Sequence, residues 1–214
     1  MSERTDEIER AAAPERAAET GCNIRSASYF IATIQAPCQQ CAAPTRLLAL
    51  ALPADHELLD PEADPDPEAD PDLEADPDLE ADHDPGFDSD TGPQTAAEPG
   101  ISTWQTEPLP AVLFDVYRVA PPVQRQLQRR SAGYRYAADG AAASGAAGCW
   151  GNHCEHCGAL QDEAALHGEP DAGFMPMSPA TAARIEVEAI AEPLLAGIAG
   201  YAVDPQFFPF PAGG

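Results

Sequence analysis

Two apolar stretches separated by a cysteine pair stand out in the first quarter of the sequence. Residues 28–52 read SYFIATIQ, then APCQQCAAP, then TRLLALAL. Short runs of aromatic, β-branched and aliphatic residues that are bounded by turn residues are typical of β-strands. We therefore predict a strand, a tight metal-binding turn and a second strand over this segment.

Two later segments also have strand patterns. Residues 111–119 (AVLFDVYRV) are rich in β-branched and aromatic side chains, which favour a pleated, half-buried surface. Residues 184–189 (RIEVEA) alternate strictly between polar and apolar positions, as a strand with one buried face does. Both segments are predicted strands.

Helical signals lie between these strands. Two prolines open residues 121–132, where they suit the first turn of a helix, and Val123 and Leu127 follow at helical spacing. The opposite face carries arginines, so the segment is predicted to be an amphipathic helix. Ser178, which is followed by proline, predicts the N-cap of another helix.

Other segments have compositions that do not favour packing. Residues 1–27 are rich in Ala, Glu and Arg without a clear apolar stripe, and we predict a disordered N-terminal arm. The stretch 138–148 (ADGAAASGAAG) predicts a flexible loop. The C-terminal tail, residues 205–214, contains FFPF, whose aromatic rings are predicted to pack over a small core.

A strongly acidic segment covers residues 53–101. Within it, residues 62–85 repeat with a period of six as EADPDP, EADPDL, EADPDL and EADHDP. Proline at one phase of the repeat disrupts helices and strand ladders, and like charges extend the chain. We predict a disordered insert that splits one domain into two halves, residues 28–52 and 102–204.

Composition narrows the classes of function. The 214 residues include 36 acidic and 11 basic ones, all arginine, and the formal net charge is −25. Residues 53–100 hold 18 of the acidic residues and no arginine. A surplus of negative charge of this size disfavours binding to nucleic acid or to anionic membranes.

The chain also lacks the signals of membrane insertion or secretion. It has no run of ~18 apolar residues, and its start is acidic and polar without an apolar core. We therefore expect a cytoplasmic protein, in which thiols stay reduced. Six cysteines in such a chain point to metal or redox chemistry before disulfides.

Four of the cysteines form two pairs with the same internal spacing, Cys38-x-x-Cys41 and Cys154-x-x-Cys157. Such a turn places both sulfurs on one side of a tight loop, and two turns supply four thiolates for one tetrahedral zinc ion. Gly158 allows the left-handed backbone that the turn often needs, whereas Ala42 holds the equivalent place in the first pair. We predict one structural Zn²⁺ held by these four cysteines.

The order strand, CxxC, strand and then a second CxxCG turn resembles a zinc ribbon, and residues 150–159 (WGNHCEHCGA) resemble zinc knuckles of uncharacterised bacterial proteins. The resemblance covers residues 28–52 and 149–175 and implies a metal role for the four paired cysteines. It leads us to expect an α+β fold, a small zinc-ribbon-like domain with short antiparallel strands, one or two helices and extensive disorder.

Two enzymatic alternatives use the same cysteines. A thiol oxidoreductase needs one C-x-x-C pair with a thiol of lowered pKa, which leaves the second pair unexplained. A zinc hydrolase or deaminase would use Pro37 with the first pair and His153-x-Glu155, but these motifs stand in the reverse of the deaminase order.

Roles for the remaining cysteines and histidines stay open in the sequence. Cys149, His153 and His156 surround the second pair and could assist the metal, whereas Cys22 lies in the predicted arm and is expected to be a free, reactive thiol. Because a four-thiolate site leaves no position for substrate, we expect a non-enzymatic module that binds another protein.

Overall fold

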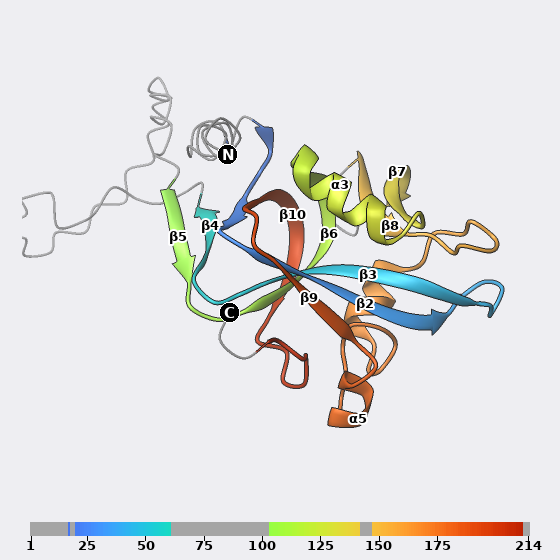
Figure 1. Ribbon diagram of the computed structural model, residues 1–214. Coiled ribbons are helices and arrows are strands. Elements are labelled where there is room, and N and C mark those ends of the chain that lie inside the picture. Colours follow the sequence, from blue (N-terminus) through green and yellow to red (C-terminus); the bar gives the residue numbers. More distant parts are fainter. Residues whose placement is uncertain (1–16, 18–19, 61–102, 142–146, 212–214) are drawn as a thin grey trace, which may run out of the picture.

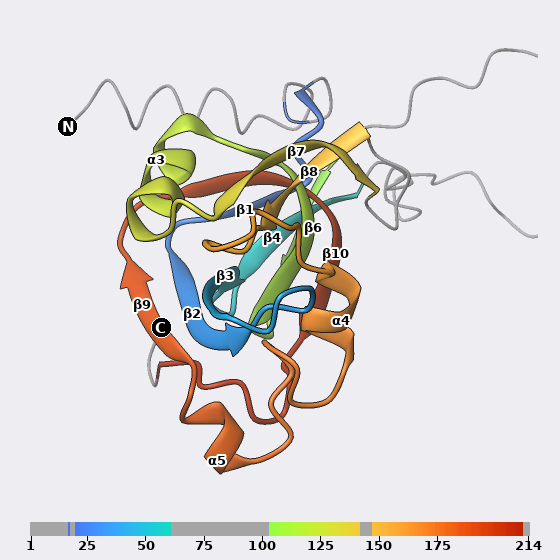
Figure 2. The ribbon, with the colours of Figure 1, turned by 90° about the vertical axis from the view of Figure 1, so that its right-hand side faces the viewer.

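The fold is dominated by one curled antiparallel sheet. The computed structural model describes residue 17 and residues 20–60, 103–141 and 147–211. Eight strands pair in the order β5-β4-β1-β10-β6-β3-β2-β9 and bend into a half-barrel (Figures 1 and 2). A separate hairpin, β7-β8, lies with helix α3 over one side of the curl (Figure 2).

Ten strands fall within the described ranges, and they are β1 (Ile24–Ser26), β2 (Tyr29–Pro37), β3 (Pro44–Leu52), β4 (His56–Asp60), β5 (Thr103–Glu107), β6 (Ala111–Val119), β7 (Tyr134–Ala141), β8 (Ala147–Asn152), β9 (Glu186–Ile190) and β10 (Leu194–Val203). Three short helices accompany them, and they are α3 (Pro121–Arg130), α4 (Glu163–Gly168) and α5 (Pro179–Ala182). No described helix has both the length and the apolar character that crossing a bilayer requires.

The predicted fold class is wrong. The resemblance to a zinc ribbon implies a small α+β domain, but the eight-stranded half-barrel makes the protein mostly β-sheet. The largest omission is β10, whose sequence LLAGIAGYAV contains two glycines that weaken a strand pattern. A Cβ atom at Gly200 would overlap the ring of Phe114 on the paired strand β6, so the close packing of β10 on β6 requires glycine there.

Several predicted elements are confirmed with small shifts at their ends. The strand predicted at residues 111–119 is β6, and the strand predicted at 184–189 is β9, which begins two residues later and ends one residue later. The predicted helix is α3, which ends at Arg130 because Ser131 has an extended backbone. Ser178 caps α5, and its side chain accepts a hydrogen bond from the backbone of Thr181.

Both faces of strand β3 are buried, which explains its continuous apolar run. Leu48 and Leu50 belong to one core cluster, which also contains Val123 and Leu127 of α3. Leu47 and its neighbours Ala49 and Ala51 belong to a second cluster on the other face, with side chains from α4 and from the C-terminal tail. Strand side chains alternate between faces, so a strand covered on both sides needs apolar residues at every position.

The C-terminal tail packs as predicted. Phe208 is buried in the second core cluster, and the Phe210 ring lies against Phe30 of β2 with 6.4 Å between ring centroids. The tail therefore covers one face of the sheet.

The segments predicted to be disordered are only partly described. Most of the N-terminal arm and residues 61–101 of the acidic insert lie outside the described residues. Strand β1 falls inside the predicted arm, strand β4 falls inside the predicted insert, and β7 and β8 extend into the predicted loop at 138–148. The division into arm, two half-domains, insert and tail stays a prediction.

Cys22 does not have the exposed thiol that we expected. Its side chain is buried against Leu195 and its backbone N–H donates to the Ala17 carbonyl. Burial raises the pKa of the Cys22 thiol, and hydrogen bonding to Thr20 opposes this rise. The prediction failed because β1, which follows Cys22, pairs with β10 and draws this part of the chain into the sheet.

Candidate metal centre

The four paired cysteines lie together in the fold. The Sγ atoms of Cys38, Cys41, Cys154 and Cys157 are all within 4.8 Å of one another. The distances Cys38 Sγ to Cys157 Sγ and Cys41 Sγ to Cys154 Sγ are both 3.7 Å. Four thiolates at ~2.3 Å from one tetrahedral ion stand ~3.8 Å apart, so this spacing suits a metal ion. It is far longer than a disulfide bond, and all four cysteines are free.

The first cysteine turn, here called the first knuckle, is the tip of the β2-β3 hairpin. The register of the two strands ends at the pair Pro37 and Pro44. Beyond it, the Cys38 N–H donates to the Ala43 carbonyl at 2.8 Å, and the Ala42 N–H donates to the Cys38 carbonyl at 2.9 Å. Ala42 has a left-handed backbone with φ of 57°, which a residue with a Cβ atom adopts at a cost.

The second knuckle follows β8 and repeats this pattern. The Cys154 N–H donates to the Ala159 carbonyl at 2.8 Å, and the Gly158 N–H donates to the Cys154 carbonyl at 2.9 Å. Gly158 has φ of 74°, as its predicted left-handed conformation requires. The two knuckles are thus built alike, with glycine at the strained position of the second and alanine at that of the first.

Backbone N–H groups point at the sulfur of the first cysteine in each knuckle. The N–H groups of Gln40 and Cys41 donate to Cys38 Sγ at 3.3 and 3.5 Å, and that of His156 donates to Cys154 Sγ at 3.3 Å. The Cys41 N–H contributes most to lowering the pKa of Cys38 to about 6. Hydrogen bonding to the backbone of Cys157 likewise lowers the pKa of Cys154. Thiolates are the form that binds metal, so these donors favour ligation.

The pKa of Cys41 moves in the opposite direction because burial and the crowded sulfurs outweigh its backbone hydrogen bond. The Ala43 backbone lowers the pKa of Cys41, but burial and the neighbouring thiols together raise it to about 12. Four thiols this close cannot all ionise unless a cation balances their charge. Four thiolates in this cluster therefore require a bound cation.

Polar side chains tie the two knuckles together. Thr45 is buried beside the first knuckle, and its hydroxyl accepts a hydrogen bond from the Glu155 N–H at 3.1 Å. The Gln39 side chain accepts from the Asp162 N–H at 2.7 Å, and the Gln161 side chain accepts from the Gln39 N–H at 3.0 Å. These links cross between segments that are more than 100 residues apart in the chain.

Sequence reasoning missed Gln161 and Thr45, which lie beside the cysteine motifs without belonging to them. A buried glutamine has no characteristic spacing in a sequence, and no pattern distinguishes it from an exposed one. Only the approach of the two knuckles shows that both side chains are enclosed.

Cys149, His153 and His156 are not members of the sulfur cluster. Cys149 is buried on β8, and burial, with the charges of Glu163 and Asp115, raises the pKa of its thiol. The ring of His153 is buried with Nδ1 3.2 Å from the Gly151 carbonyl, and His156 is exposed. Among the described residues, the group able to hold a metal consists of the four paired cysteines.

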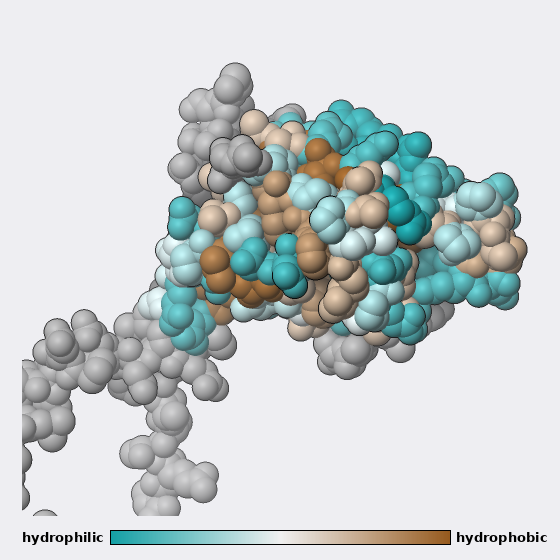
Figure 3. Space-filling model, turned by 90° about the horizontal axis from the view of Figure 1, so that it is seen from below, coloured by the Kyte–Doolittle hydropathy of each residue, from teal (hydrophilic) through white to brown (hydrophobic). Residues whose placement is uncertain are grey.

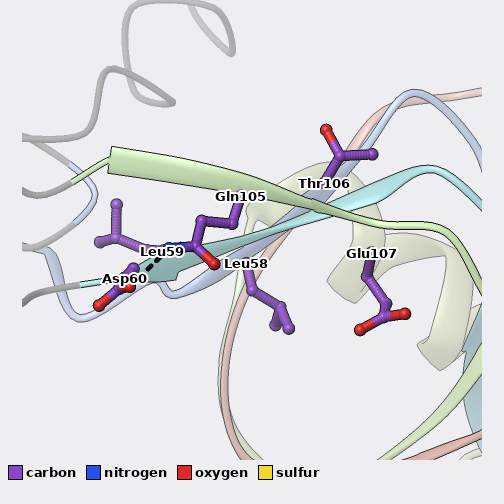
Figure 4. A pocket seen from close by; sticks show the side chains of 6 residues that line it. All are labelled: Leu58, Leu59, Asp60, Gln105, Thr106 and Glu107. Atoms are coloured by element: carbon purple, nitrogen blue, oxygen red, sulfur yellow. Dashed lines mark hydrogen bonds between the residues drawn. The ribbon is translucent and has the colours of Figure 1, made fainter. Parts of the chain in front are cut away.

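A surface recess between two strands lies away from the cysteines. It has a volume of about 280 Å³ and is formed by β4 and β5 (Figure 4), and its lining residues are Leu58, Leu59, Asp60, Gln105, Thr106 and Glu107. Gln105 donates to Asp60 at 2.6 Å across this hairpin. No cysteine or histidine is among these lining residues, so the recess shares no residue with the sulfur cluster.

Apolar side chains reach the surface in small groups. The face seen from below mixes apolar and polar residues (Figure 3). The exposed large apolar side chains of the described chain lie in separate strands and loops, and they are Leu109, Tyr136, Leu160, Met177 and Val203. Scattered residues of this kind are ordinary in soluble domains and do not define an interface.

Comparison with known proteins assigns no family to the chain: no family model matches it, and no curated protein or solved structure is significantly similar to it. The resemblance to a zinc ribbon is therefore limited to the paired cysteine turns. Function has to be argued from the site itself.

Proposed function

We propose that Cys38, Cys41, Cys154 and Cys157 bind one structural Zn²⁺. The observation that carries this proposal is the cluster of four sulfurs within 4.8 Å, with two 3.7 Å distances between the knuckles. Four thiolates fill the tetrahedral coordination of zinc and leave no position for a substrate. The site therefore stabilises the fold rather than taking part in a reaction.

The ion would fasten the tip of the β2-β3 hairpin to the segment that follows β8. Each close sulfur pair joins one knuckle to the other, and the two knuckles are separated by more than 100 residues of sequence. Closing so long a loop restricts the unfolded chain strongly, and structural zinc contributes on the order of 10 kcal/mol in zinc-finger peptides.

The enzymatic alternatives gain no support from this geometry. The deaminase hypothesis needs His153 as a ligand, but its ring nitrogen faces the Gly151 carbonyl and it lies outside the sulfur cluster. The oxidoreductase hypothesis needs one reactive pair, whereas the 3.7 Å contacts join Cys38 to Cys157 and Cys41 to Cys154.

We further propose that the module binds an acidic segment of another protein through an arginine surface, defined as Arg46, Arg125, Arg129 and Arg130. Arg46 reaches the C-terminal end of α3, where its Nη1 donates to the Arg130 carbonyl at 3.3 Å. Arg125 and Arg129 are exposed one turn apart on α3. Arg130 pairs with Glu188, but the other three make no ion pair with any carboxylate of the described chain.

Metal content tests the first proposal. Protein purified without chelators should contain one zinc per chain, and chelation should lower the melting temperature. Cys154→Ser should remove most of the bound zinc, whereas Cys149→Ser, at a buried cysteine outside the cluster, should retain it. Stoichiometric iron in place of zinc would keep the tetrathiolate site but change its metal. Metal-free protein with an unchanged melting temperature would refute a structural role.

Binding of polyglutamate at low salt tests the second proposal. The double substitution Arg125→Glu and Arg129→Glu should weaken this binding, and added salt should weaken it further, because exposed ion pairs are screened. The double substitution Arg118→Glu and Arg184→Glu is the matched control, since both arginines are exposed, lie outside the arginine surface and give the same change in net charge. Equal binding by the two double variants would contradict the assignment of this surface.

A further inference from the structure

The side chain of Gln161 is enclosed between the two cysteine knuckles. It is only 2% exposed although it follows an exposed turn. Buried amides require hydrogen-bond partners, because an unpaired polar group loses its hydration without compensation. The hydrogen bonds of the Gln161 side chain therefore show which groups hold it between the knuckles.

Every polar group of this side chain has a partner. Gln161 Nε2 donates to Cys38 Sγ at 3.5 Å and to the Ala159 carbonyl at 2.8 Å. Gln161 Oε1 accepts from the Gln39 N–H at 3.0 Å. One amide thus touches the sulfur and the backbone of the first knuckle and the backbone of the second.

The backbone of Gln161 continues the connection into the sheet. Its N–H donates to the Asn152 carbonyl at 2.7 Å. The Asn152 side chain in turn bonds both backbone groups of Leu48 on β3 and donates to Glu163 of α4 at 3.3 Å. The amide that touches the sulfur is therefore supported by two packed elements and is not free to turn away.

We propose that Gln161 is a positioning residue of the metal centre, which orients the Cys38 thiolate by an N–H···S bond and sets the separation of the knuckles. This inference rests on the proposed metal site. Cys38 then has three N–H donors, from Gln40, Cys41 and Gln161, and the amide is the one that comes from the opposite knuckle. The Gln161 amide therefore links the charge on the Cys38 thiolate to the position of the second knuckle.

Two substitutions separate the hydrogen bond from the space that the side chain fills. Gln161→Glu keeps the shape and the acceptor for the Gln39 N–H, but it places a carboxylate oxygen against Cys38 Sγ. Gln161→Met fills similar space without either bond. Gln206→Glu is the matched control, since it adds the same charge to an exposed residue of the C-terminal tail, outside the metal centre.

Zinc affinity is measured by competition with a chromophoric chelator on the full chain. Replacing a group that hydrogen-bonds to a metal ligand commonly lowers affinity ~10–100-fold, and we expect a loss in this range for Gln161→Met and a larger loss for Gln161→Glu. Gln206→Glu should bind zinc as the unsubstituted chain does.

Cobalt supplies a readout that a purely structural role would not change. The N–H···S bond withdraws electron density from the thiolate, so its loss should move the sulfur-to-cobalt charge-transfer band of Co²⁺-loaded Gln161→Met to lower energy. Circular dichroism of each variant shows whether it is folded.

The outcomes separate the two proposals. If the unsubstituted chain gives no tetrathiolate cobalt spectrum, the metal site itself is wrong and this inference falls with it. If that spectrum is present but both Gln161 variants match the control in zinc affinity and in band energy, only the role of Gln161 is overturned.

Discussion

Asn152 on β8 acts as a strand partner for Leu48 on β3. Its Oδ1 accepts the Leu48 N–H at 2.7 Å, and its Nδ2 donates to the Leu48 carbonyl at 2.9 Å. Asn152 is fully buried, so these two hydrogen bonds are shielded from solvent. Because β3 follows the first knuckle and β8 precedes the second, this one side chain aligns the two halves of the candidate metal centre.

We expect Asn152→Leu to destabilise the protein by about 2–4 kcal/mol, since it leaves two buried backbone groups of Leu48 without partners. Urea unfolding at neutral pH measures this change. The variant should also bind zinc more weakly, because the knuckles lose their alignment. A loss of stability under ~0.5 kcal/mol would mean that these backbone groups find other partners.

Ala42 and Gly158 occupy equivalent positions with a left-handed backbone. Exchanging alanine and glycine at these positions should change the stability of the protein in opposite directions. Ala42→Gly should stabilise the protein by about 0.5–1 kcal/mol, because glycine relieves the strain of positive φ but loses more entropy on folding. Gly158→Ala should destabilise it by about 1 kcal/mol from backbone strain alone, since a Cβ there would meet only Arg135, at 3.9 Å. Thermal melting of both zinc-loaded variants tests this pair, and changes of equal sign would contradict it.

Asp115 on β6 should make stability depend on pH. Burial raises the pKa of its carboxyl, as does the charge of Glu163 and, less strongly, that of Asp162, while His167 opposes them. The charge of Asp115 in turn raises the pKa of the buried Cys149 thiol. With a pKa above its unfolded value, Asp115 favours the folded state when protonated, and this contribution disappears as pH rises through the folded pKa.

Asp115→Asn removes this dependence while keeping a residue type that tolerates the left-handed φ of 50°. We expect the variant to gain stability over the unsubstituted protein as pH rises from the unfolded pKa of an aspartate to neutrality, and no gain well below it. Urea unfolding at a series of pH values measures the difference. A gain that does not vary with pH would exclude titration of Asp115 as its cause.

Residues 61–102 should be replaceable by a two-residue Asn-Gly turn. Asp60 and Thr103 are directly paired at the end of β4 and β5, a spacing that such a turn can close. The resulting chain should keep its zinc and its cooperative unfolding, because the removed residues contain few large apolar side chains. Removing residues 55–98 instead should destabilise it, since this range contains β4 with the fully buried His56. Unfolding curves of both deletions make the comparison.

Local sequence was sufficient to predict the elements whose signals lie within a few residues of one another. The two CxxC turns, strand β6, helix α3 and the cap at Ser178 each follow from side chains close in sequence, and each is present. Spacing alone also identified the four cysteines that now lie together.

What only the tertiary structure decided is the relation between distant segments. The sheet order places β10 between β1 and β6, and the glycines that permit this contact weaken the strand signal of β10 itself. Burial of Cys22 and of Gln161 depends on strands and turns far along the chain. A residue's environment after folding depends on such long-range contacts, whereas secondary-structure propensity and hydrophobic periodicity depend only on residues close in sequence. The order of the strands and the burial of the residues around the sulfur cluster could therefore not be predicted from propensity or periodicity.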